Sequence, residues 1–389
     1  MVAQDLNALV SSTGPGTPCG ELMRRYWQPV GLSREVTPGG KPIARKIMDA
    51  ELVLFRDNAG RPGLLGLHCS HRLTSLGYGR VEDGGIRCPF HGWLYDVEGR
   101  CLEQPAEPEG TTFNTRVQHP AYPCDELGGL IWAYMGPPDK KPLLTRYQTL
   151  VREDGTRAAS FYLINSNYLQ NVEGAVDTAH FSFLHADPWS VAKQVYASAP
   201  RMKTSFVETE YGIRQSKTVV NPHTRELGSS HNYFIMPAGF MGEGRGGEQN
   251  YQVQSWYVPS DDTHTMRFQV AFRGPGPDGA PYAWPEDNGY IQPGPENDYF
   301  RDYDHVDTIC GIPLRAVQTS GKGLMAQDNM VNETQGPIVD RSREHLGVHD
   351  VVLLAMRKMM HKAMDDIREG ADPKHIIRDP DANKIVYVR

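Results

Sequence analysis

The sequence lacks several features, and each absence excludes a class of protein. No run of 18 or more apolar residues occurs in the 389 residues, so we expect no membrane-spanning helix and no membrane partner. Residues 1–18 contain no basic stretch followed by an apolar one, which predicts that no secretory signal is present. The formal net charge is −7 and no basic block is interleaved with aromatic residues, so nucleic acid is not an expected partner.

Cysteine is scarce, and so are cofactor-binding motifs of the nucleotide type. Six cysteines in a chain of this length are too few for a disulfide framework. With no export signal, they predict a protein of the reducing cytoplasm, where free thiols can bind metal. No G-x-G-x-x-G motif follows a predicted strand and opens a helix, so no nicotinamide or flavin domain is expected.

Glycine and proline are abundant, at 39 and 29 residues, and they separate short β-rich runs in the first 140 residues. These runs predict a small antiparallel domain. They are Ile43–Met48, Leu52–Phe55, Leu64–Leu67 and Gly129–Met135. A helix is expected near Pro18–Trp27, with Thr17 as its N-cap. Because residues 136–142 are typical of a boundary, we divide the chain into residues 1–145 and 146–389.

The second part of the chain predicts an antiparallel sheet with helices, which makes the whole chain α+β. The predicted strands are Gln215–Val220, Asn232–Ile235, Tyr251–Val258 and Met266–Phe272, and the predicted helices are the centre of Ser160–His185, Leu324–Glu333 and Asp350–Glu369. In the last helix, a methionine-rich face is expected to pack in the core, and Gly370 is the stop. Residues 274–295, rich in Gly, Pro and Asp, predict a surface loop or lid.

Two short loops within residues 67–95 carry one cysteine and one histidine each. Cys69 and His71 form a C-x-H pair, and Cys88 and His91 form a C-x-x-H pair. A Rieske [2Fe–2S] cluster needs two thiolates for one iron and two imidazoles for the other. The alternative is a Cys₂His₂ zinc site, but zinc fingers usually keep the two cysteines on one side and the two histidines on the other. The mixed order favours the cluster.

Other residues near these loops are predicted to be neighbours of the cluster. The set of four ligands is already complete without His68 and Cys101. We therefore expect His68 to be structural and Cys101 to pack near the cluster as a surplus thiol.

A second constellation contains Asp177, His180 and His185. The two histidines are five residues apart, about 140° around a regular helix, so they can share an ion only if the helix ends or bulges between them. Two histidines with one carboxylate form the facial triad of non-heme Fe(II) oxygenases. Taken alone, the pattern is weak, and two structural histidines are the default. The upstream cluster favours a metal site, because its electrons need a destination.

The carboxylate of this triad is not determined by periodicity. Asp177 points along the predicted helix and is better placed behind the histidines than on the metal. Asp328, Glu333 and Asp340 are the downstream alternatives.

With both constellations in view, the chain resembles the terminal oxygenase (alpha) subunit of Rieske non-heme iron aromatic oxygenases, most closely the phthalate dioxygenase branch. The resemblance covers nearly the whole chain. Its marks are residues 14–18, 24–27, the cluster loops, the Asp177/His180/His185 segment, Gln327-Asp328, and residues 336–342 and 344–347. One departure follows the first cluster histidine, where many relatives have Arg-Gly-Ala and this chain has Arg72-Leu73-Thr74.

The resemblance implies a helix-grip, START-like catalytic domain and assigns roles to residues. Asp328 becomes the iron carboxylate, and Asp177 links His180 to His91 of a neighbouring subunit, so that electrons cross a subunit boundary. It also implies a head-to-tail C₃ homotrimer. O₂ is a co-substrate, and because no nucleotide motif is present, NAD(P)H acts only through a separate flavin or iron–sulfur reductase.

The substrate implied by the resemblance is a small aromatic compound, often a carboxylate. Arg214, Lys217 and Arg267 lie on predicted strands of the second domain and could bind a carboxylate, although such residues are more often exposed. The product is a hydroxylated ring, a cis-dihydrodiol, or a demethylated compound with formaldehyde. Alternatives are an N- or O-dealkylating monooxygenase acting on a non-carboxylate aromatic, a Rieske electron carrier, and a ligand sensor.

Overall fold

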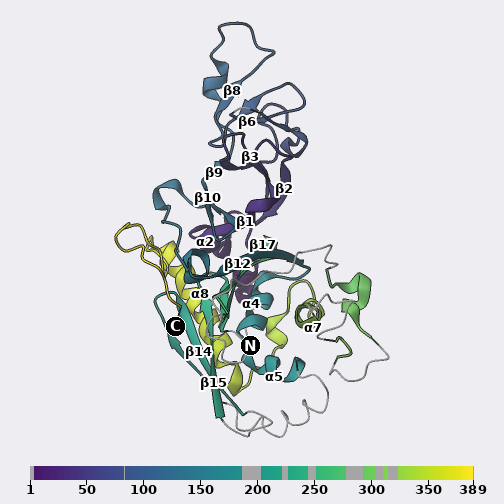
Figure 1. Cartoon of the computed structure of the whole chain (residues 1–389), viewed down its shortest axis with the longest axis vertical. Coiled ribbons are helices and arrows are strands. Elements are labelled where there is room, and N and C mark those ends of the chain that lie inside the picture. The colour runs from purple at the N-terminus through teal and green to yellow at the C-terminus, as the bar shows by residue number, and fades with distance from the viewer. Residues whose placement is uncertain are drawn as a thin grey trace.

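The computed structural model shows two domains joined end to end, with small sheets in one and a large sheet covered by helices in the other (Figure 1). The described residues are 4–82, 84–185, 203–220, 227–243, 251–276, 292–302, 310–313 and 323–388. Of the loop predicted at 274–295, residues 277–291 lie outside this set. No helix in the described ranges is both long and apolar enough to cross a bilayer.

The first domain consists of three antiparallel sheets, with strand orders β1-β11-β10, β2-β3-β4-β9 and β5-β6-β7-β8. Its strands are β1 (Trp27–Leu32), β2 (Ile43–Ile47), β3 (Ala50–Arg56), β4 (Pro62–Gly66), β5 (Arg80–Glu82), β6 (Gly85–Arg87), β7 (Leu94–Tyr95), β8 (Cys101–Glu103), β9 (Ala121–Tyr122), β10 (Cys124–Leu127) and β11 (Leu130–Tyr134). The four predicted strands are confirmed as β2, β3, β4 and β11. The all-β character of this domain is therefore confirmed.

Two helices precede these strands, α1 (Gln4–Ser11) and α2 (Pro18–Arg24). Thr17 caps α2 as predicted, because its hydroxyl accepts a hydrogen bond from the Gly20 N–H at 3.1 Å. The predicted extension of this helix to Trp27 is wrong. Trp27 opens β1 and pairs with Tyr134 of β11, and Pro29, which has no N–H, cannot continue a helix. Both helices pack against the second domain, where α2 contacts α8.

The second domain contains one antiparallel sheet, which has seven strands in the described ranges, in the order β12-β18-β17-β16-β15-β14-β13. Its strands are β12 (Thr156–Ile164), β13 (Lys203–Glu208), β14 (Gly212–Val220), β15 (Leu227–Ile235), β16 (Gly239–Glu243), β17 (Tyr251–Asp261) and β18 (His264–Arg273). The four predicted strands are confirmed, and β12, β13 and β16 were not predicted. Strand β12, all nine residues of which pair with β18, overlaps the start of Ser160–His185, and the helix predicted at the centre of that segment is confirmed as α4.

Within the described residues of this domain, the α-helices are α3 (Gln148–Val151), α4 (Tyr168–Val176), α5 (Thr178–Leu184), α7 (Gly323–Glu333) and α8 (Val351–Arg368). The predicted core face of α8 is confirmed, since Met356, Met359 and Met360 are buried. Gly370 ends this helix with a φ of 85°, in the left-handed region that glycine adopts most easily. The α+β fold class is confirmed, and the boundary at residue 145 stays a prediction.

A buried ion network ties α4 to the C-terminal residues. Glu173 on α4 accepts bonds from Arg341 at 2.8 Å and from Arg357 of α8 at 2.6 Å. Arg357 also pairs with Glu344 at 2.8 Å. Arg341, together with Arg357 and Glu344, therefore holds α4 in place, the helix that leads into the predicted iron site.

Glu173→Gln should destabilise the protein strongly, because two guanidinium groups would stay buried around a neutral amide. Removing one partner of a buried ion pair costs about 3–5 kcal/mol. We expect a lower thermal midpoint for the catalytic domain, followed by circular dichroism. The exposed Glu369→Gln at the end of α8 is the matched control. Equal midpoints for the two variants would contradict a stabilising network.

Candidate metal centres

The two cysteine–histidine loops of the first domain have the same backbone design. In the first loop, Cys69 N–H donates to the Thr74 carbonyl and Leu73 N–H to the Cys69 carbonyl, each at 2.9 Å. In the second, Cys88 N–H donates to the Trp93 carbonyl at 2.8 Å and Gly92 N–H to the Cys88 carbonyl at 3.1 Å. Each loop is therefore closed by the same pair of backbone hydrogen bonds around its cysteine.

The four side chains meet in the space between the loops. The rings of His71 and His91 have centroids 4.6 Å apart, and Cys69 and Cys88 are buried as free thiols. His91 Nδ1 is buried without a hydrogen-bond partner, as expected of a nitrogen that ligates a metal. Burial raises the pKa of Cys88, opposed by the N–H groups of Phe90 and His91, which favour the thiolate.

The geometry fits a two-iron cluster better than one zinc ion. Ligand atoms around a single tetrahedral zinc lie about 3.3–3.8 Å apart. Among the described residues, only one group brings three candidate ligand atoms within 4.8 Å of one another, and it contains none of these four residues. The larger spread suits a cluster whose two irons take two ligands each.

Aromatic and polar side chains surround this first site. The Tyr95 hydroxyl lies 3.2 Å from Cys69 Sγ, and the Trp93 ring stacks on His71 with centroids 4.5 Å apart. Cys101 packs in the same buried core as the two loop cysteines, as the sequence predicts. His68 bonds Glu51 and the Leu73 carbonyl, which agrees with the structural role expected for it.

The second site forms where the helical conformation is interrupted at Asp177, between α4 and α5. Asp177 has an extended conformation, with φ −68° and ψ 112°, and its Oδ1 accepts a bond from Ala179 N–H at 2.7 Å. Asp177 is therefore the N-cap of α5, and its other carboxylate oxygen lies 3.7 Å from His180 Nδ1. The helix ends at Leu184, so His185 lies just beyond it, and no bulge is needed to bring the histidines together.

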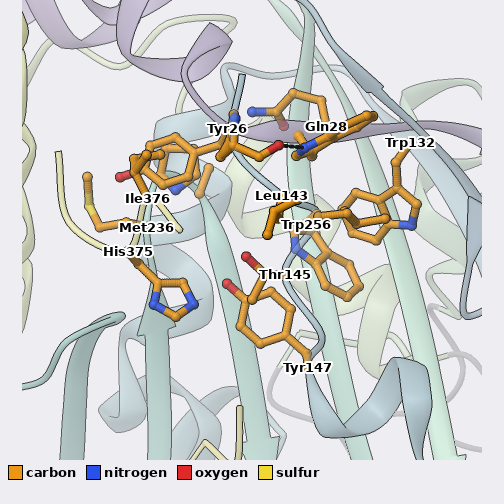
Figure 2. Close-up of a pocket in the computed structure, with 15 residues that line it drawn as sticks. Tyr26, Gln28, Trp132, Leu143, Thr145, Tyr147, Met236, Trp256, His375 and Ile376 are labelled. Carbon is orange, nitrogen blue, oxygen red and sulfur yellow. Dashed lines mark hydrogen bonds between the residues drawn. The ribbon is translucent and has the colours of Figure 1, made fainter. Parts of the chain in front are cut away.

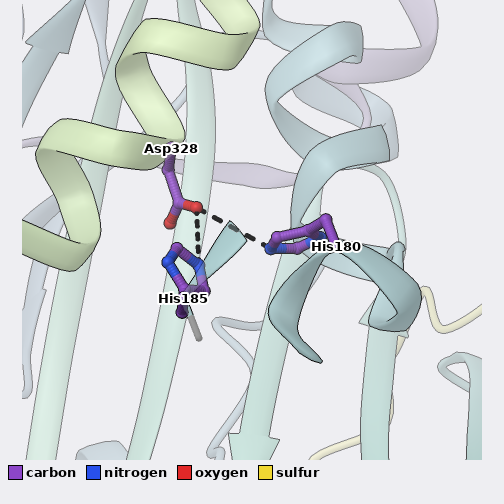
Figure 3. A group of neighbouring side chains, drawn as sticks. All are labelled: His180, His185 and Asp328. Atoms are coloured by element: carbon purple, nitrogen blue, oxygen red, sulfur yellow. Dashed lines mark ion pairs between the residues drawn. The ribbon is translucent and has the colours of Figure 1, made fainter. Parts of the chain in front are cut away.

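His180, His185 and Asp328 converge on one point, as Figure 3 shows. His185 Nε2 lies 3.0 Å from Asp328 Oδ1, and His180 Nε2 lies 3.7 Å from the same oxygen. Asp328 comes from α7, so the site joins two segments that are far apart in the sequence. Two imidazoles and one carboxylate on one side of an ion are the donor set of a non-heme iron site with open positions. The residues present fit such an ion.

The other predicted carboxylates lie elsewhere. Glu333 accepts bonds from the Tyr299 hydroxyl and from Asn165 N–H, both at 2.9 Å. Asp340 is exposed and caps the turn at Ser342. Of the three alternatives that periodicity left open, the structure brings Asp328 alone to the histidines.

Sequence reasoning gave no role to Gln327, whose side chain is fully buried. Its Nε2 donates to the Ile312 carbonyl at 2.7 Å, so its Oε1 must accept, and His185 Nδ1 lies 2.7 Å from that oxygen. His185 therefore carries its proton on Nδ1 and directs the Nε2 lone pair at the site. The sequence did contain a signal for this role, because Gln327 directly precedes Asp328 on the same helix.

Electrostatics keeps both acids of the site ionised. Burial opposes ionisation of Asp328, but the adjacent imidazoles of His185 and His180 and the guanidinium of Arg267 outweigh it and hold its pKa below the ordinary value. Burial also opposes ionisation of Asp177, and the contact with His180 again holds the pKa low. Two carboxylates that stay charged at neutral pH suit the binding of a cation.

The structure separates the three basic residues predicted for substrate binding. Arg267 of β18 pairs across the sheet with Tyr257 of β17 and acts electrostatically on Asp328. Lys217 is buried, with Nζ 4.8 Å from the ring centre of Phe181 on α5. Arg214 is three residues from Lys217 on β14, so its side chain leaves the opposite face of the strand.

A cavity of about 30 Å³ is lined by side chains from both domains, among them Trp132 and His375 (Figure 2). Its lining includes Trp256, whose neighbour Tyr257 points the opposite way, toward Arg267. This volume holds about one water molecule and no aromatic substrate. Among the described residues, the chemistry therefore centres on the triad face.

Comparisons with known proteins identify the family of both parts of the chain. A family model for the Rieske [2Fe-2S] domain matches residues 26–121, and one described as LigXa C-terminal domain like matches residues 133–380. The 5,5'-dehydrodivanillate O-demethylase oxygenase subunit of a Sphingobium strain is 33% identical, covering 99% of this chain and 86% of that protein. The phthalate 4,5-dioxygenase oxygenase subunit of Pseudomonas putida is 32% identical, covering 95% and 88%. The crystal structure of dicamba monooxygenase bound to dicamba matches in fold, with a TM-score of 0.64 and 17% identity over 89% of this chain and 98% of that chain.

The chain therefore belongs to the Rieske non-heme iron oxygenases, as an oxygenase subunit of the phthalate dioxygenase-like branch. It is an oxidoreductase that incorporates O₂, and it carries a Rieske [2Fe–2S] cluster and a mononuclear iron. Its electrons come from a separate reductase. The alternatives of a lone electron carrier and a ligand sensor are wrong.

Proposed function

We propose that this protein hydroxylates or oxidatively demethylates a small aromatic carboxylate. Cys69, His71, Cys88 and His91 hold the cluster. His180, His185 and Asp328 hold the iron, which, when bound, supplies the site where O₂ is activated with electrons from the cluster. The buried, ionised triad supports this assignment.

We infer that electrons reach the iron from the cluster of a partner subunit. Strand β6, which leads into the second cluster loop, and β8 of the same sheet lie at the opposite end of the molecule from α5 and α7 (Figure 1). Because the electron-transfer rate falls exponentially with distance, transfer within one chain would be slow. In a head-to-tail homotrimer, Asp177 would join His180 to His91 of the partner subunit. The partly exposed carboxylate of Asp177, 3.7 Å from His180 Nδ1, supports this link.

The reductase is proposed to be a flavin or iron–sulfur protein that takes electrons from NAD(P)H, and the compartment to be the cytoplasm. All six cysteines are free thiols, which supports a reducing environment. The absence of a nucleotide-binding motif in the sequence supports a separate protein as the NAD(P)H-using component.

The environment of Arg267 is the main evidence that the substrate is a carboxylate. Its guanidinium lies 5.4 Å from the ring centre of Tyr257, and its side-chain hydrogen bond, to Ser255 Oγ, is long at 3.4 Å. Within the described residues, no carboxylate forms an ion pair with Arg267. A half-buried guanidinium with donors to spare beside the iron triad suits a substrate carboxylate. Lys217, on the α5 side of the triad, is the second candidate. The role predicted for Arg214 has no support from this geometry.

A panel of methoxybenzoates and their methyl esters, assayed with a surrogate reductase, tests this proposal. Formaldehyde release indicates demethylation, and hydroxylated rings indicate ring attack. Arg267→Met should lower kcat/KM for carboxylates by about 10–100-fold, because hydrogen bonds to charged groups contribute about 1.5–3 kcal/mol. The esters should change little. Arg214→Met, on the opposite sheet face, is the matched control. Preference for esters in the wild type would instead favour a dealkylating enzyme for neutral aromatics.

The Tyr95 hydroxyl is predicted to raise the reduction potential of the cluster. Its bond to Cys69 stabilises the more negative, reduced cluster. A tenfold preference for the reduced state corresponds to about 59 mV in a one-electron couple, so Tyr95→Phe should lower the potential by about 60 mV. A spectroscopic redox titration measures the change. Tyr78→Phe, an exposed tyrosine beside the first loop, should leave the potential unchanged.

A further inference from the structure

His119 belongs to neither predicted ligand set, yet it is 1% exposed in the core of the first domain. Its backbone N–H donates to the Gly99 carbonyl at 2.8 Å. Its ring Nε2 lies 2.8 Å from the Gly66 carbonyl oxygen, and its Nδ1 lies 2.7 Å from Ser70 Oγ. Because both ring nitrogens and the backbone have partners, the imidazole is held in one orientation.

The two ring contacts determine where the proton of His119 lies. A carbonyl oxygen only accepts, so Nε2 carries the proton and donates it to Gly66. Burial lowers the pKa of His119, which favours the neutral ring. Nδ1 is then an acceptor, and the Ser70 hydroxyl must donate to it. Ser70 stands between Cys69 and His71 in the first cluster loop, so this bond ties the loop to the core of the domain.

The same imidazole supports the ring of Tyr95. The two rings are stacked, with centroids 4.6 Å apart and planes 30° apart. Tyr95 is fully buried, and its hydroxyl lies 3.2 Å from Cys69 Sγ. A hydrogen bond weakens steeply as its angle departs from linearity, so this bond depends on the tilt of the Tyr95 ring. The stacked imidazole limits that tilt.

We propose that His119 is a positioning residue for the cluster, with two separate effects. Through Tyr95 it maintains a hydrogen bond that raises the reduction potential, and through Ser70 it holds the first cluster loop in place. The inference rests on the proposed assignment of Cys69 and His71 to the cluster. Hydrogen bonds to the cysteine sulfurs help to set the potential of such clusters, and the groups behind metal ligands fix their orientation. His119 therefore acts on electron transfer without touching the cluster.

A double-mutant cycle with Tyr95→Phe tests the effect on the potential. His119→Leu removes the stacked ring and should favour the oxidised cluster about fivefold, or about 40 mV in a one-electron couple. In the Tyr95→Phe background, the same substitution should change the equilibrium by less than about twofold, because the bond that His119 supports is already absent. His119→Phe keeps a ring against Tyr95 and should retain most of the wild-type potential. Spectroscopic redox titration of the holoenzyme measures each value. His349→Leu, at an exposed histidine of the second domain, is the control.

The rate of cluster loss tests the effect on the loop. In the presence of an iron chelator, the visible absorbance of the oxidised cluster should decay about fivefold faster in Ser70→Ala and in His119→Leu than in the wild type. Ser70→Ala should keep the wild-type potential, because the hydroxyl donates its proton to His119 and not to the cluster. Ser70 is exposed, so this variant stays informative if His119→Leu does not fold.

Three results would overturn the inference and leave the proposed function intact. They are a wild-type potential in His119→Leu, an equal shift of the potential with and without the Tyr95 hydroxyl, and a wild-type rate of cluster loss in Ser70→Ala. Cys69→Ala tests the ligand assignment separately, because it should abolish the cluster. A cluster retained in Cys69→Ala would reject that assignment, whatever the His119 variants do.

Discussion

Asp177→Asn should reduce product formation at least a hundredfold while the cluster and the iron stay bound. The substitution keeps the size of the side chain and an oxygen that can cap α5 through Ala179 N–H. It removes the negative charge and replaces one acceptor oxygen with an NH₂ group. A bridge between two imidazoles needs two acceptors, so the amide breaks the link to one of them.

Rapid mixing of the reduced enzyme with substrate and O₂ measures this directly. In the wild type, the cluster should be oxidised as product forms. In the variant, the cluster should stay reduced, although metal analysis finds both centres loaded. Asp177→Ala is a poorer test, because loss of an N-cap costs about 1 kcal/mol and would disturb His180 through α5. Asp340→Asn, at another capping aspartate, is the matched control. Cluster oxidation at the wild-type rate in Asp177→Asn would refute the electron path.

Asp328→Ala should release the mononuclear iron and leave the cluster in place. The carboxylate oxygen lies 3.0 Å from His185 Nε2 and 3.7 Å from His180 Nε2, and it is the anionic member of the triad. Loss of groups that merely support a ligand costs 10–100-fold in metal affinity, so loss of the ligand itself should exceed about a hundredfold. The cluster loops are in the other domain, away from α7 (Figure 1).

The ratio of iron to labile sulfide measures the effect. Wild type should contain three irons for each two sulfides, and Asp328→Ala two for two, because only the cluster remains. Glu333→Gln and Asp340→Asn are controls from the same part of the chain and should keep the third iron. Iron retained in Asp328→Ala but lost in Glu333→Gln would mean that the triad is assembled differently.

Local sequence determined much of this protein, wherever ligands lie close together in the chain. Each cluster loop contains its cysteine and histidine within three residues of each other, so spacing alone indicated the cluster. The core face of α8 followed from helical periodicity, and the N-cap at Thr17 from local hydrogen bonding. Strand β12 was missed, because its nine backbone pairs are with β18, a segment far away in the sequence.

Tertiary structure decided which side chains from distant segments of the sequence come into contact. It chose Asp328 over Glu333 and Asp340, because the packing of α7 against α4 determines which acid faces the histidines. It also revealed the Gln327 contact with His185. The sequence by itself determined which chemistry the chain carries, since metal ligation depends on residue types held close by short loops. Which carboxylate completes the triad depends on contacts between residues more than a hundred positions apart, and those exist only in the folded chain.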